Sequence, residues 1–86
     1  MPRINEFYGT LIYMYYRDHA PPHFQVIYGQ HEAAVAIDKQ EMLEGYLPSR
    51  ALGLVLEWSQ RYPHELWLDW ELARVHQPLM PIPPLE

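Results

Sequence analysis

The spacing of the hydrophobic residues changes once along this chain, near Pro48, and this change limits the folds that the sequence can adopt. Before Pro48, short segments are rich in aromatic and β-branched residues, which pack well in strands. After it, apolar residues recur three and four positions apart, as on one side of a helix. A strand-forming half followed by a helix-forming half predicts an α+β fold, with a small antiparallel sheet of three or four strands packed against two C-terminal helices.

The first half contains two segments with the composition of strands. Residues 9–17 are expected to form the first strand, and residues 23–38 a β-hairpin. Between them, Pro21 and Pro22 remove two consecutive backbone donors, so the chain has to leave the sheet there in a rigid turn. Residues 39–47 fit either a short edge strand or an irregular loop, and we favour the strand.

The second half predicts two helices, one starting at Pro48 and the other near Pro63, because proline is tolerated in the first turn of a helix. Four more prolines then fall in residues 78–86. A segment this rich in proline is extended, and it either lies on the surface or is mobile. We therefore expect a single α+β domain over residues 1–77 and a Pro-rich C-terminal tail over residues 78–86.

The same periods predict which side chains face the core. The residues expected to be largely buried are Phe24, Val26, Val35, Ile37, Leu52, Val55, Leu56 and Trp70. The tryptophans fall at helical spacing and should pack between the helices and the sheet, namely Trp58, Trp67 and Trp70. The acidic residues expected on a solvated face are Glu41, Glu44, Asp69 and Glu71.

Length and charge exclude several classes of protein. With 86 residues the chain has room for one domain, and without cysteine neither a disulfide nor a thiolate metal site can support its core. The net charge is -5 and the arginines are scattered, which argues against a broad surface for duplex DNA. No apolar run approaches the ~20 residues that span a bilayer, and the N-terminus is polar, so we expect a cytoplasmic protein with no membrane contact.

The stretch "YYRDHAPPHFQV", residues 15–26, holds the chemistry-bearing side chains at the highest density. Together with "MPRINEFYG", "LEGYLPSRAL", "LVLEW", "WELAR" and a Pro-Leu tail, it resembles the small bacterial family catalogued as domain of unknown function 4160. The resemblance covers essentially the whole chain. It implies a partner gene that encodes another small domain, and a toxin–antitoxin-like pairing, but no established activity.

Two chemical interpretations of this stretch can be compared. A metal site would use His19 and His23 with Asp18, but zinc sites need three or four good ligands, and Gln25 stands where the family usually has a further histidine. We therefore expect no metal and no cofactor. A metal-independent ribonuclease-like enzyme needs a base, an acid and a cation, and the candidate catalytic residues are His19, His23, Arg17 and Tyr16.

A structural interpretation competes with both. Pro21 and Pro22 fix a corner of the chain whether or not a substrate binds there. If the stretch is a site, the rigid corner should hold His19 and His23 on the same side, near Arg17 or a tyrosine hydroxyl and partly open to solvent.

An interaction module needs no catalytic residue at all. A small acidic domain with uncovered aromatic side chains can bind a partner through an apolar patch. We therefore expect one component of a two-protein, toxin–antitoxin-like module, which binds a small partner protein encoded by a neighbouring gene. The ribonuclease-like enzyme, with RNA as its substrate, is the alternative.

Overall fold

The computed structural model describes residues 3–16 and 21–85 of the chain, which form a sheet and two helices. All neighbouring strands pair antiparallel, and their order in the sheet is their order in the sequence. The strands are β1 (Arg3–Phe7), β2 (Thr10–Tyr13), β3 (His23–Tyr28), β4 (His31–Ala36) and β5 (Met42–Gly45). The helices are α1 (Ser49–Arg61) and α2 (Pro63–Arg74). The predicted α+β class is confirmed.

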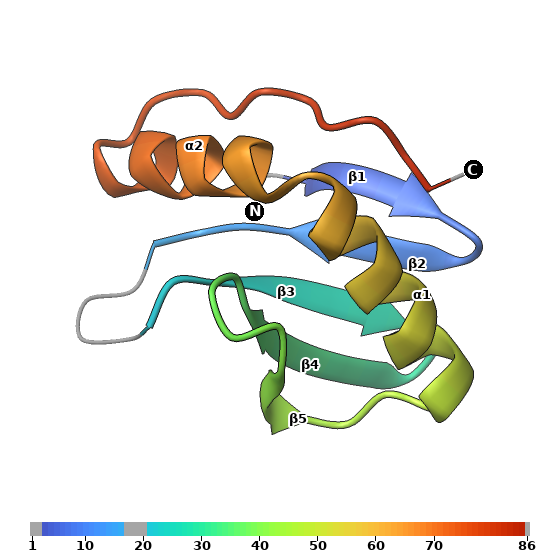
Figure 1. Cartoon of the computed structure of the whole chain (residues 1–86). Coiled ribbons are helices and arrows are strands. Elements are labelled where there is room, and N and C mark those ends of the chain that lie inside the picture. The colour runs from blue at the N-terminus through green and yellow to red at the C-terminus, as the bar shows by residue number, and fades with distance from the viewer. Residues whose placement is uncertain (1–2, 17–20, 86) are drawn as a thin grey trace.

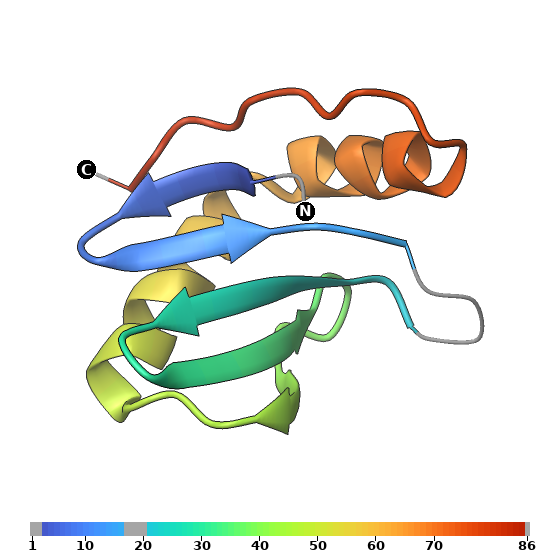
Figure 2. The ribbon, with the colours of Figure 1, turned by 180° about the vertical axis from the view of Figure 1, so that it is seen from behind.

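The helices follow the strands in the chain, and α1 crosses one face of the sheet (Figure 1). Seen from behind, the opposite face of the sheet is covered by no helix of the described chain (Figure 2). The hairpin expected over residues 23–38 is confirmed as β3 and β4, and the favoured edge strand in residues 39–47 is β5. Both helices begin at or directly after the predicted prolines.

The sheet has five strands, so the expectation of three or four was too low. The missing strand is β1, which pairs with β2 through a turn at Tyr8 and Gly9, where both residues have positive φ. Such a two-residue turn matches the natural twist of a hairpin. β1 escaped prediction because a bulge between Arg3 and Asn5 breaks the period of two, so that Ile4 and Phe7 are the buried residues.

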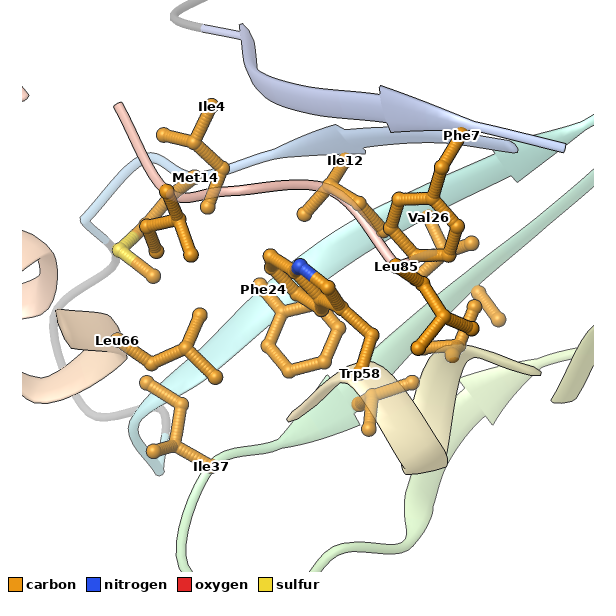
Figure 3. Packing of buried hydrophobic residues seen from close by; sticks show 14 of the residues in the cluster. Ile4, Phe7, Ile12, Met14, Phe24, Val26, Ile37, Trp58, Leu66 and Leu85 are labelled. Atoms are coloured by element: carbon orange, nitrogen blue, oxygen red, sulfur yellow. The ribbon is translucent and has the colours of Figure 1, made fainter. Parts of the chain in front are cut away.

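The core is centred on Trp58, whose indole is fully buried between the sheet and α1 (Figure 3). Its ring centroid lies 5.4 Å from that of Phe7 and 5.8 Å from that of Phe24. Six of the eight predicted core residues are buried, while Leu52 and Leu56 are only partly buried at its edge. Trp70 packs as expected, but Trp67 does not, because 40% of its surface is exposed.

The Pro-rich tail runs back along α2 and ends next to β1 (Figures 1 and 2). It is extended, as expected, and it buries the side chains of Ile82 and Leu85 in the main core. Its prolines lack the N–H groups that a sheet ladder requires, so side chains of the domain bind its carbonyl groups instead. The tail thus covers part of the core that the two helices leave open.

Candidate functional site

The proline corner of the motif is described from Pro21 onward, whereas Arg17 and His19 lie outside the described residues. The carbonyl of Pro22 accepts a hydrogen bond from the Ile37 amide at 3.0 Å, which fastens the corner to the end of β4. The first residue of β3, His23, has its Nδ1 2.8 Å from the carbonyl oxygen of Pro21. Because a carbonyl can only accept, Nδ1 carries the hydrogen, and the neutral ring has its free lone pair on Nε2.

Two of the predicted site residues meet at one indole. The ring centroid of Trp70, on α2, lies 5.2 Å from that of Tyr16 and 5.5 Å from that of His23. The three rings come from the segment that follows β2, the start of β3 and the middle of α2. The fold therefore brings Tyr16 and His23 together, with Trp70 as the common contact.

His23 is only 3% exposed, so the expectation that it would be partly open to solvent is wrong. The physical reason is its contact with Trp70, which covers the imidazole from the helix side. Trp70 is far from His23 in the sequence, so nothing in the sequence around His23 indicates this contact. The predicted relation between His23 and His19 remains a prediction, because His19 lies outside the described residues.

A surface cavity of about 370 Å³ adjoins this cluster. Tyr15 and Tyr16 line one side of it, and residues at the end of α2 and the start of the tail line the other, including Ala73, His76 and Gln77. His76 has a φ of 60°, a left-handed conformation that usually belongs to glycine at a helix end. Sequence reasoning missed His76, although a histidine directly after a helix and shortly before a proline is a recognisable signal.

Gln25, which stands where the family usually has a histidine, lies away from this cavity. It lines a separate depression of about 300 Å³ together with Glu32 and Glu44. Within residues 3–16 and 21–85, no three His, Cys, Asp or Glu side chains are grouped so that they could hold a metal ion. A larger cavity of about 720 Å³ lies at the opposite end of the sheet and is lined by other residues, among them Tyr8, Tyr28 and Arg50.

Asp69 is fully buried, which contradicts the expectation that it belongs to a solvated face. It lies on the buried side of α2 with Leu66 and Trp70, and the tail contacts it at Met80. Its Oδ1 accepts a hydrogen bond from the Met80 amide at 2.8 Å, while no described residue bonds its buried Oδ2. Desolvation raises the pKa of Asp69 above its ordinary value of 3.8, and the Met80 hydrogen bond opposes that rise.

We expect Asp69→Asn to change how stability depends on pH. A raised pKa means that the folded protein binds the proton more tightly than the unfolded chain does, so Asp69 lowers stability as pH rises from 3.8 through the folded pKa. Relative to the wild type, the variant should therefore gain stability over this window. Urea unfolding at a series of pH values measures the difference, with Glu41→Gln as a control for net charge. A difference that stays constant with pH would contradict the assignment.

Among the described residues, the cation closest in sequence to His76 is already paired. Arg74, the last residue of α2, binds Glu71 at 3.1 Å. The hydrogen bond to Glu71 and the negative charge of its carboxylate raise the pKa of Arg74. Arg3 and Arg61 likewise pair with glutamates at the surface. Exposed pairs of this kind contribute little to stability. The described residues that line the cavity therefore include tyrosine and histidine side chains, and α2 adds no unpaired arginine to them.

These features define a small α+β domain whose antiparallel sheet has helices on one face and an aromatic cluster at its proline corner. A family model described as Domain of unknown function (DUF4160) matches residues 9–71, which is more than half of the chain. The chain belongs to this family. No curated protein and no solved structure matches it. None of the described helices is both long enough and apolar enough to cross a membrane.

Proposed function

We propose that this protein is one component of a two-protein, toxin–antitoxin-like module and acts by binding a small partner protein. The family resemblance implies such a pairing. The observation that supports it best is the distribution of apolar side chains around α2. One side of the helix is buried through Leu66 and Trp70, yet the other side also carries large apolar residues. A helix that is apolar on both sides is typical of one with two contacts.

The exposed side of α2 forms a continuous stripe. Leu68 and Leu72 of α2 lie on one side of the helix, and Val75, which caps its end, continues the row three positions later. Leu68 is 51% exposed and Val75 is 49% exposed, while Leu72 is partly buried. We call these three residues the outer stripe. Anchors at this spacing are the ones with which a helix binds an apolar groove on a partner.

The charge around the stripe indicates the kind of partner. The chain has a net charge of -5, and Glu65 is an exposed acid of α2 beside the stripe, whereas Glu71 is paired with Arg74. A partner with an apolar groove edged by basic residues would complement both features, and opposite charges increase the rate of association. The neighbouring gene product is the first partner to examine.

Expression with and without the neighbouring gene tests the module, with growth as the measurement. For direct binding we expect Leu68→Glu to weaken the complex by about tenfold or more, because the charge falls among the anchors. Leu43→Glu is the matched control, since Leu43 is an exposed leucine on β5, away from α2. If both variants bind the partner as well as the wild type does, the outer stripe is not the interface.

A metal-independent ribonuclease-like enzyme that uses the His19 and His23 region is the second candidate. The meeting of Tyr16 and the buried His23 at Trp70 favours it, because Tyr16 and His76 line the adjoining cavity. Nε2 of His23 has the lone pair that a general base requires. The purified protein should then cleave RNA in the presence of a chelator.

The histidine variants test the enzyme further. We expect His23→Asn to lower the cleavage rate by ~100-fold or more, as the loss of a general acid or base does. His64→Asn is the control, because His64 is an exposed histidine in the first turn of α2. Cleavage that is absent from the wild type, or equal in both variants, would remove the enzyme from consideration.

A further inference from the structure

The face of the sheet that no described helix covers carries a row of side chains across four strands (Figure 2). Tyr13 on β2 lies opposite Gln25 on β3, Gln25 lies opposite Ala34 on β4, and Ala34 lies opposite Glu44 on β5. Phe24 belongs to the core, and side chains alternate between the two faces of a strand. The row therefore faces away from the helices.

The middle of this row is hollow, because Ala34 is small. Neighbouring strands lie ~4.8 Å apart, so the backbones of Gln25 and Glu44 are ~10 Å apart with only a methyl group between them. Glu32 comes two residues before Ala34 on β4 and faces the same side. We call the cavity of about 300 Å³ that these residues line the acidic depression. It has an amide on the β3 side and carboxylates on β4 and β5.

Gln25 is the residue that points to a ligand. It is only 5% exposed and it lines the depression, yet its side-chain amide makes no hydrogen bond within the part of the chain that the structure describes. Buried amides are normally hydrogen-bonded, because an unpaired amide gives up its bonds to water without replacement. An amide oxygen beside two carboxylates suits a ligand that only donates.

A guanidinium group meets this condition. It has five N–H donors in a planar fork and no acceptor, so it can bond the amide oxygen of Gln25 and a carboxylate at the same time. Tyr13, next to Gln25 in the row, is an aromatic residue of the kind on which a guanidinium stacks. A divalent metal ion fits less well, because no three His, Cys, Asp or Glu side chains of residues 3–16 and 21–85 are grouped so that they could hold one.

We propose that the acidic depression binds an arginine side chain of a partner protein. Charge supports this occupant, since the chain has a net charge of -5. The cation at the β1 end of the row, Arg3, is already paired with Glu6 at 3.2 Å. The depression lies on the sheet and the outer stripe lies on α2, so this inference goes beyond the binding proposed for α2 and is tested separately from it.

Short peptides test the recognition of arginine directly. The probe is acetyl-Gly-Arg-Gly-amide, and the matched control contains citrulline in place of arginine, because citrulline keeps the shape of the side chain and loses its charge. We expect the arginine peptide to shift the ¹⁵N NMR amide signals of Gln25, Ala34 and Glu44, with a Kd of about 1 mM. The citrulline peptide should bind about tenfold more weakly or less, since charge-assisted hydrogen bonds are the stronger ones.

Substitutions in the depression test which side chains hold the peptide. Gln25→Met keeps the length of the side chain but removes the amide, and Glu32→Gln removes one charge. Each should weaken the arginine peptide by about fivefold or more. Glu65→Gln is the control for net charge, because Glu65 is an exposed acid on α2, and it should bind as the wild type does. The NMR spectrum of each variant shows whether it is folded, and Glu32→Gln keeps the test decisive if Gln25→Met is not.

Three results would overturn the proposal. The first is that the arginine and citrulline peptides bind equally, or that neither shifts a signal of the depression. The second is that Glu32→Gln binds the arginine peptide as tightly as Glu65→Gln does. The third is that calcium chloride displaces the peptide, or that a peptide with lysine binds as tightly, because the depression would then be a general cation site and not a site for arginine.

Discussion

Replacing Trp58 with Ala is expected to lower the free energy of unfolding by about 3–5 kcal/mol, which is most of the stability of a domain this small. Trp58 is fully buried and contacts the rings of Phe7, Phe24 and Tyr62. Its indole also holds the tail through Pro83, so the substitution would leave a cavity and release part of the cover of the core.

Urea unfolding followed by circular dichroism measures the loss, and Trp67→Ala is the matched control. Trp67 is 40% exposed on α2, so its replacement should cost about 1 kcal/mol or less. Equal losses for the two tryptophans would mean that Trp58 is not the centre of the core.

Gly45→Ala is expected to have the second large effect, because it would disrupt the pairing of β4 and β5. Gly45 has a φ of 87°, and a Cβ atom there would collide with the backbone oxygen of Glu32 and lie 2.7 Å from Cα of Ala33. Backbone atoms cannot move aside as the end of a side chain can. We expect a loss of more than ~2 kcal/mol from the left-handed conformation and the collision together.

Gly53→Ala provides a control of opposite sign. Gly53 lies inside α1 with open space around its missing Cβ, and alanine favours a helix over glycine by about 1 kcal/mol. Calorimetry should therefore show a lower melting temperature for Gly45→Ala and a higher one for Gly53→Ala. If Gly45→Ala is as stable as the wild type, β5 does not pair closely with β4.

The candidate site was only partly predictable from the sequence. Tyr16 and His23 stood out because the motif concentrates reactive side chains, and the fold does bring these two together. The involvement of Trp70 and His76 could not be derived locally, because α2 reaches the proline corner only when the chain folds back on itself. The same contact explains why His23 is buried rather than accessible.

Asp69 shows that exposure cannot be inferred from the charge of a side chain alone. An acidic residue between Leu68 and Trp70 on a helix is ordinarily solvated, and helical spacing alone does not reveal what covers the helix. In the structure the tail passes over this position and supplies the Met80 amide to its carboxylate. Asp69 is therefore buried because the tail packs against α2 at this position.

Local sequence was sufficient for the elements whose signals are local. The alternation in residues 23–38 and the turn that contains Gly29 determine the hairpin of β3 and β4, and the prolines at 48 and 63 mark the starts of both helices. The remaining features could not be derived from local sequence. The bulge hid β1, which brings the number of strands to five. The tail became part of the core because Asn5 and Trp58 donate to its carbonyl groups, whereas its prolines have no N–H to donate to a ladder. These outcomes depend on contacts between residues far apart in the chain, which form only when the domain closes.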